Sequence, residues 1–229
     1  MCAYRHKMLN TLLKRLLKMN QIATYNHALC IGITGGIGSG KSYICHQLQT
    51  AGHHVFYCDD VAKHIIRTHA EVKRELRQLV GNDVYDAEGH LVKSVLAAYL
   101  CRGNDYAQQV NSIVHPRVAE AFKQQAASLQ PVDADVAHIL PHGKQFISIE
   151  QLKQLPTSGT LFMECALLFE SGFDQLVQHS VLVHVSHDTQ LARLMARDHI
   201  NREKALSWMA LQLSEADKMQ RADYILVNE

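Results

Sequence analysis

A stretch near the start of the chain has glycines, a lysine and a serine in a spacing that suits phosphate binding. Residues 30–42 read CIGITGGIGSGKS and contain the pattern G-x-x-x-x-G-K-[ST], from Gly35 to Ser42. A backbone loop that wraps a polyphosphate must bring its N–H groups close to the phosphate oxygens, and glycines leave room for that approach. The pattern therefore predicts a site for a nucleoside triphosphate.

Each residue type in this loop suggests a role. Lys41 would contact the β and γ phosphates, and the Ser42 hydroxyl would bind Mg²⁺. The N-terminus of the following helix would add free N–H groups and the positive end of its dipole. We expect the nucleotide to be bound by Gly35, Gly36, Ile37, Gly38, Ser39, Gly40, Lys41, Ser42 and Tyr43.

The elements beside the loop are those that such a motif requires. Residues 29–34 are apolar and rich in β-branched side chains, which is typical of a strand buried on both faces. Residues 43–49 can continue as a helix. Strand, loop and helix therefore follow one another in the required order.

Two carboxylates follow a second predicted strand, residues 54–57. Asp59 and Asp60 would lie at the carboxyl end of that strand, where open α/β sheets bind ligands. Either could deprotonate a hydroxyl or hold Mg²⁺ through water. Either could instead cap the next helix, since Asp is a favoured N-cap. We expect Asp59 to be catalytic.

The chain from Asp60 to about residue 130 has a helical pattern, broken by turn-rich residues 81–83 and 86–89, which indicates a helical insertion between strands. Pro116 suits the first position of a helix, so one helix is predicted to end near His115 and another to begin at Pro116. His115 could contact a phosphate or a base, or be a structural histidine.

Residues 129–159 hold three of the four prolines and favour a loop or an insertion. Within them, Ser148 and Gln151 have the spacing of a capping box, which predicts a short helix over residues 149–155.

Three further strands are predicted, at residues 160–163, 180–185 and 223–227, for five in all. Glu164 follows the first of these and could support Mg²⁺, bind substrate or cap a helix. Arg193 and Arg197 are spaced i, i+4, so they share one helix face and could both reach phosphates, or form an ordinary solvated surface.

Composition limits the class of protein. The chain has 229 residues, 47% hydrophobic and 20% charged, enough for one sizeable core with smaller subdomains. Lys and Arg number 23 against 22 acids, so the total charge does not indicate a nucleic-acid partner. Six cysteines without a C-x-x-C pair argue against a disulfide framework and a zinc site, and favour the cytoplasm.

Residues 1–28 are basic, and no acid precedes Asp59. Leucines recur at helical spacing, but basic residues interrupt them and the stretch is too short to span a membrane. A transit peptide or a membrane-surface helix would fit a basic amphipathic start. We favour a dispensable extension, with Met19 as an alternative start, and expect no membrane partner.

Six blocks, in order, resemble the dephospho-coenzyme A kinase family. They are ITGGIGSGKS at 33–42, CDDVAK at 58–63, NSIVHP at 111–116, ECALLFESG at 164–172, RLMARD at 193–198 and ADYILVN at 222–228. The resemblance implies a doubly wound parallel sheet like that of nucleoside monophosphate kinases, a helical domain for the pantetheine substrate, and a lid.

The resemblance also implies roles for single residues. Asp59 matches the aspartate expected to activate the ribose 3′-hydroxyl, Arg193 and Arg197 match lid arginines, and Asn228 falls near the expected adenine pocket. We place Asp59, His115 and Glu164 on the substrate side. The chain departs from the family where many members have D-A-D instead of its Tyr57-Cys58-Asp59, in a longer insertion, and in lacking a helix after Asn228.

These inferences combine into one expectation. The fold is α/β, a P-loop NTPase-type doubly wound parallel five-stranded sheet with a helical insertion and a helical lid. Its parts are an extension (1–28), a nucleotide-binding core (29–58 and 160–229) with a lid at about 188–221, a helical substrate domain (59–128) and an insertion (129–159). The expected reaction is ATP-dependent phosphorylation of the 3′-hydroxyl of dephospho-coenzyme A with Mg²⁺. A nucleoside or nucleoside monophosphate kinase is the alternative enzyme, and a nucleotide-dependent switch is the alternative that is not an enzyme. The sequence assigns no oligomeric state.

Overall fold

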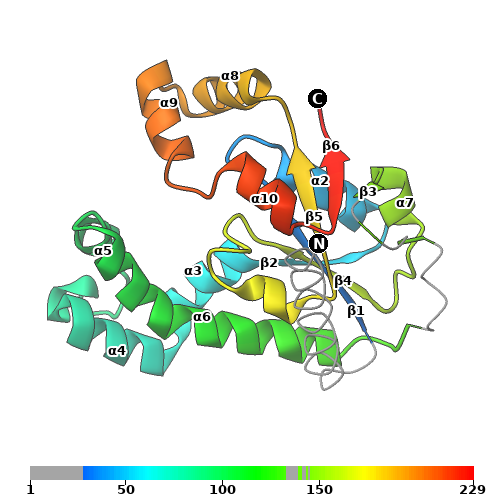
Figure 1. Cartoon of the computed structure of the whole chain (residues 1–229). Helices are drawn as coiled ribbons and strands as arrows, with labels where there is room; N and C mark the ends of the chain where they lie inside the picture. Colours follow the sequence, from blue (N-terminus) through cyan, green and yellow to red (C-terminus); the bar gives the residue numbers. More distant parts are fainter. Residues whose placement is uncertain (1–27, 133–138, 141–142, 144) are drawn as a thin grey trace, which may run out of the picture. The chain divides into compact units, whose positions relative to one another are not determined.

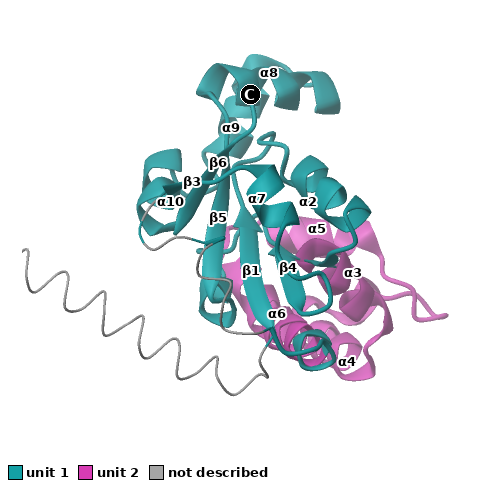
Figure 2. Ribbon diagram, turned by 90° about the vertical axis from the view of Figure 1, so that its right-hand side faces the viewer, with its two compact units in different colours: residues 1–56, 125–229 teal, residues 57–124 magenta. Residues whose placement is uncertain are grey.

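The computed structural model describes residues 28–132, 139–140, 143 and 145–229 (Figure 1). The predicted N-terminal extension therefore lies outside the described residues, apart from Ala28. The described chain forms two compact units (Figure 2). The first runs up to Phe56 and resumes at Gln125, and the second is Tyr57–Gln124.

Among the described residues the sheet has six strands, in the order β2-β4-β1-β5-β6-β3. Strand β1 pairs in parallel with β4 and β5, and β6 pairs in parallel with β5 and β3. The parallel α/β class predicted from the sequence is therefore confirmed. The strands are β1 Leu29–Thr34, β2 His54–Tyr57, β3 Gln145–Phe146, β4 Thr160–Glu164, β5 His179–His184 and β6 Tyr224–Val227.

The sixth strand, β3, corrects the predicted count of five. It has two residues, both exposed, at the edge of the sheet beside β6. So short a segment has no alternation of apolar and polar residues from which a strand could be predicted. Only its pairing with β6, continued by the Ile147 N–H that donates to the Ile225 carbonyl at 2.9 Å, defines it.

The centre of the sheet is apolar and closed to solvent. Every residue of β1 and β4 is buried, as a parallel strand covered on both faces requires. Ile31 pairs with Phe162 across the two strands, and both side chains are fully buried. Helix α2 (Lys41–Thr50) packs against β1, β4 and α7 (Ile149–Lys153) (Figure 2). The loop between β1 and α2 is thus held on a rigid support.

The helices of the first unit begin at side-chain caps in several places. Ser148 and Gln151 form the predicted capping box in front of α7, although the helix ends at Lys153 and not at residue 155. Ser186 caps α8 and Ser214 caps α10. The remaining elements of this unit are η3 Phe173–Leu176, α8 His187–Asp198, α9 Arg202–Met209 and α10 Glu215–Arg221.

The second unit is helical. An ion pair between Arg117 and Glu75 (2.7 Å) joins α6 to α4, and the Tyr85 hydroxyl donates to the Ile66 carbonyl at 2.7 Å. The unit's elements are α3 Cys58–Thr68, α4 Ala70–Val80, η1 Asn82–Val84, α5 Lys93–Leu100 and most of α6 Asn104–Ala127.

Helix α6 corrects the predicted boundary at Pro116, because the proline lies inside one continuous helix. Proline has no N–H to donate and would normally end the helix. Here the side chains at four-residue spacing from Val110 through Val114 and Val118 to Phe122 are all buried, so tertiary packing holds both halves of the helix in line.

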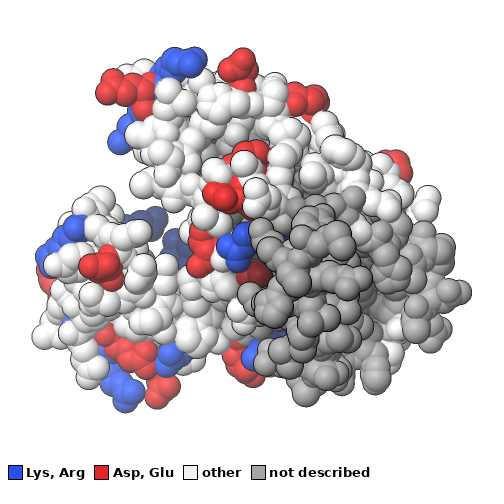
Figure 3. All heavy atoms as spheres, in the orientation of Figure 1, with Lys and Arg blue, Asp and Glu red and all other residues white. Residues whose placement is uncertain are grey.

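No helix in the described ranges has the length and hydropathy that crossing a bilayer would require. On the face drawn in Figure 3, basic and acidic side chains are interspersed, in keeping with 23 Lys and Arg against 22 acids in the chain.

Candidate functional site

The loop between β1 and α2 needs glycine where its neighbours approach most closely. Gly40 is the N-cap of α2 in the left-handed region (φ 88°), and a Cβ there would lie 2.3 Å from Asn228 Nδ2. At Gly35 a Cβ would lie 2.6 Å from the backbone oxygen of Val183. The glycines therefore serve the packing of the loop as well as its openness to a ligand.

Lys41 points back into this loop. Its side chain is buried, and its Nζ donates to the Gly35 carbonyl at 2.9 Å and to the Gly36 carbonyl at 3.3 Å. The first turn of α2 contains no acidic residue, so no carboxylate there neutralises the positive end of the helix dipole. Ser42 and Tyr43 lie on that same turn and are exposed. The loop can therefore attract an anion to a preformed group of donors.

Glu164 lies at the end of β4, opposite Ile33 of β1, and is buried. The pKa of the buried Cys45 thiol shows which charged groups lie near it. Burial raises the pKa of Cys45, the Glu164 carboxylate raises it further, and the Lys41 ammonium opposes the rise. The carboxylate and the ammonium thus both lie close enough to Cys45 to act on its thiol. The thiol stays protonated and is not a nucleophile.

Asn228 and Arg193 lie against the far side of the loop. The Asn228 side chain donates to the Ser39 carbonyl at 2.9 Å, and Arg193 Nη1 donates to the Asn228 carbonyl at 2.9 Å. Asn228 is itself held by β5, because its N–H donates to the His184 carbonyl. A cationic group from α8 is thereby placed beside Gly40.

The two predicted arginines have different surroundings. Arg197 Nε and Nη2 donate to the Asp198 carboxylate at 3.1 and 2.7 Å. This partner raises the pKa of Arg197. Arg193, by contrast, reaches the residues beside the loop. The i, i+4 spacing predicts a shared helix face but not which neighbour each side chain selects.

Two glutamines beside the loop were missed by the sequence reasoning. Gln190 Nε2 donates to the Ile37 carbonyl at 2.7 Å, and the Ile37 N–H donates to Gln212 Oε1 at 2.9 Å. Gln190 lies three residues before Arg193, so its shared helix face was an available signal. Nothing in the sequence around Gln212 indicates a contact with the loop.

Asp59 and His115 belong to the second unit. Asp59 is exposed in the first turn of α3, directly after β2. The N-cap of α3 is Tyr57, so the alternative in which an aspartate caps this helix is wrong: the helix begins one residue before Asp59. His115 is half-buried within α6, and burial lowers its pKa.

The chain is similar to known proteins along nearly all of its described length. The sequence model of the dephospho-CoA kinase family matches residues 29–141 and 137–229. A dephospho-CoA kinase from Bacteroides fragilis is 33% identical over 202 residues, covering 88% of this chain and 85% of its own. One from Fusobacterium nucleatum is 28% identical, covering 87% and 89%.

Solved structures show the same fold. The protein TT1252 from Thermus thermophilus superposes with a TM-score of 0.66 at 25% identity, covering 89% of this chain and 90% of that one. A dephospho-CoA kinase from Campylobacter jejuni superposes with a TM-score of 0.54 at 19% identity, covering 87% of each chain. The family model is matched over two overlapping stretches that together run from residue 29 to residue 229, so this chain belongs to the dephospho-CoA kinase family.

Proposed function

We propose that this chain transfers the γ-phosphoryl group of ATP to the ribose 3′-hydroxyl of dephospho-coenzyme A, giving coenzyme A and ADP. The observation that carries the proposal is the family match over residues 29–141 and 137–229, on a chain whose phosphate-binding loop is formed. Phosphoryl transfer depends mainly on positioning and charge neutralisation, and the first unit offers a loop of donors, a buried lysine and an arginine beside them.

In this proposal Asp59 accepts the proton of the 3′-hydroxyl. The oxygen then forms a bond to the γ-phosphorus while the bond from that phosphorus to the ADP oxygen breaks. Lys41 leaves the Gly35 and Gly36 carbonyls to contact the β and γ phosphates. Arg193 and Arg197 neutralise the charge on the transferred group, which for Arg197 requires release from Asp198.

The donors present suit Mg²⁺. This ion prefers hard oxygen ligands and keeps several waters while it bridges phosphates. The exposed Ser42 hydroxyl on the first turn of α2 and the Glu164 carboxylate at the end of β4 supply such oxygens. We propose that Ser42 ligates Mg²⁺ directly and that Glu164 supports the ion through water or binds substrate. The bound ion would neutralise phosphate charge.

We assign the remaining parts of the chain as follows. The helical residues 59–128 hold the pantetheine-bearing substrate, with Asp59 and His115 on the substrate side, and residues 188–221 act as a lid. The adenine of ATP lies near Asn228, and Tyr43 flanks the phosphates. The described cysteines Cys30, Cys45, Cys58, Cys101 and Cys165 form no disulfides, which supports a reducing cytoplasm as the location. We propose a small-molecule substrate and no nucleic-acid partner.

The acceptor test uses ADP release with Mg²⁺ and ATP. Dephospho-coenzyme A, adenosine, AMP, CMP and pantetheine are supplied in turn. We expect dephospho-coenzyme A to be preferred by several orders of magnitude in kcat/KM, with the new phosphate on the 3′-oxygen, because binding of the pantetheine arm orients the hydroxyl. Faster turnover of any nucleoside or monophosphate would replace this proposal with the alternative kinase. ATP binding without any turned-over acceptor would favour a nucleotide switch.

Removal of residues 1–27 should leave the enzyme active. The described core starts with β1 at Leu29, whose N–H donates to the Gly159 carbonyl at 2.9 Å. We expect a chain that starts at Ala28 to keep kcat, the KM for ATP and the melting temperature of the full chain. A loss of nucleotide binding in the shortened chain would make the extension part of the site and contradict this expectation.

A further inference from the structure

We propose that Gln190 and Gln212 are positioning residues that clamp Ile37, at the tip of the phosphate-binding loop, and so fix the shape of the loop before ATP binds. Both backbone polar groups of Ile37 are engaged by these side chains. The Ile37 carbonyl accepts from Gln190 Nε2 at 2.7 Å, and the Ile37 N–H donates to Gln212 Oε1 at 2.9 Å. One glutamine acts as the donor and the other as the acceptor.

Gln190 fits closely against the loop. It is buried, and a Cβ at Gly36 would lie 2.0 Å from its Nε2. A Cβ at Gly38 would lie 2.8 Å from the backbone oxygen of Gln190. Two loop glycines therefore make room for this residue of α8, apart from any role toward phosphate.

The Ile37 side chain completes the contact. It packs against a buried apolar cluster formed by Leu191 and Leu194 of α8 and Ala205 of α9. The segment from α8 to Gln212 thus holds the carbonyl, the N–H and the side chain of Ile37. Loop and segment must move together or separate at all three contacts.

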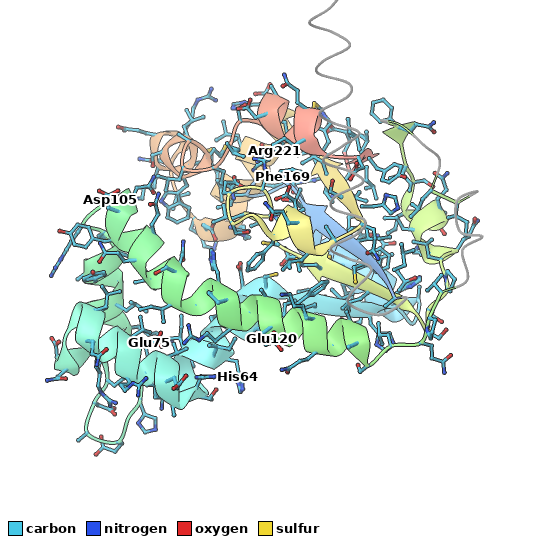
Figure 4. The ribbon with its side chains drawn as sticks, turned by 60° about the horizontal axis from the view of Figure 1, so that its bottom comes forward. His64, Glu75, Asp105, Glu120, Phe169 and Arg221 are labelled. Carbon is cyan, nitrogen blue, oxygen red and sulfur yellow. The ribbon has the colours of Figure 1, made fainter. Side chains whose placement is uncertain are left out.

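Gln212 is held in place by its own surroundings. Lys218 Nζ donates to Gln212 Oε1 at 3.4 Å, and the N–H of Leu213 donates to Glu170 Oε1 at 3.0 Å. At the end of α10, Arg221 lies over the Phe169 ring, 4.7 Å from its centroid (Figure 4). The acceptor for the Ile37 N–H is therefore held by Lys218 and by the contacts of the residues that follow it in the chain.

The clamp has a consequence for nucleotide binding, and this part rests on the proposed function. Because the Ile37 N–H already donates to Gln212, we expect the phosphates to be bound by other N–H groups of the loop and by the N-terminus of α2. A loop already held in its binding shape loses less conformational entropy when ATP binds. The clamp should therefore lower the KM for ATP and have little influence on kcat.

The test exploits the opposite hydrogen-bonding roles of the two glutamines. Gln212→Glu keeps an acceptor for the Ile37 N–H, with Lys218 beside the new carboxylate, whereas Gln212→Ala removes it. Gln190→Glu replaces the donor with an acceptor facing a carbonyl, and Gln190→Met removes the donor at similar size. Gln220→Glu, on the exposed side of α10, controls for added negative charge.

Hydrogen exchange of loop peptides is measured on the nucleotide-free variants, and the KM for ATP on the same preparations. We expect Gln212→Ala, Gln190→Glu and Gln190→Met to speed exchange and raise the KM about three- to tenfold, the range for losing one hydrogen bond. Gln212→Glu and Gln220→Glu should stay within about twofold of wild type, with kcat unchanged throughout.

Two outcomes would overturn the clamp: Gln212→Glu behaving like Gln212→Ala, or Gln190→Glu leaving loop exchange unchanged. Melting temperatures identify any variant that fails to fold, and the isosteric Gln190→Met then supplies the donor test. Because exchange is measured without nucleotide, it decides on the clamp even if the wild-type enzyme fails to phosphorylate dephospho-coenzyme A, a result that would overturn the proposed function alone.

Discussion

Replacement of Asp59 with asparagine is expected to lower kcat by about two orders of magnitude or more, the usual contribution of a general base. Asp59 lies two residues after the end of β2 and is exposed in the first turn of α3, so it is open to a substrate hydroxyl. Asparagine has nearly the same size but cannot accept the proton. Binding of ATP should stay near wild type, since the proposed donors to its phosphates lie in the loop and in α2.

Asp60 provides a matched control for this experiment. It is the next residue in the same turn, also exposed, and forms an ion pair with Lys63 at 3.0 Å. Asp60→Asn should change kcat by less than about threefold, because an exposed ion pair of this kind contributes little. If a folded Asp59→Asn enzyme turns over dephospho-coenzyme A at nearly the normal rate, Asp59 has no part in proton transfer.

Replacement of Lys41 with methionine should lower kcat/KM for ATP by about a thousandfold, in the range found for removing one preorganised donor from a transition state. The Lys41 side chain is buried, and its ammonium donates to the Gly35 and Gly36 carbonyls. Methionine keeps the apolar stem and removes the charge. Both the binding of phosphates and their neutralisation during transfer are then lost.

The same substitution has a structural side that must be measured separately. Without Lys41 the Gly35 and Gly36 carbonyls lose their donor, which should reduce the free energy of unfolding by about 1 kcal/mol. Lys63→Met removes an exposed lysine and serves as the control. Calorimetric ATP binding and melting temperatures separate the two effects. Wild-type kcat/KM in a folded Lys41→Met enzyme would remove this residue from the mechanism.

The sequence by itself determined the parts of this protein whose residues are close together in the chain. The apolar run of β1, the glycine pattern of the loop and the start of α2 follow one another without a gap, so periodicity and spacing suffice to predict them. The capping box at Ser148 and Gln151 was predictable for the same reason, since its two partners are three residues apart. The proposed chemistry of the loop rests on its residue types.

Only the tertiary structure decided which distant groups meet. The contacts of Ile37 with Gln190 and Gln212 join residues 153 and 175 positions apart, and Asn228 reaches Ser39 across 189. The edge strand β3 exists through pairing with β6, and Pro116 stays within α6 because buried side chains on both sides of it hold the helix together. Local patterns record the preferences of a segment, whereas these features depend on partners that folding brings near, and propensity gives way to packing where the two conflict.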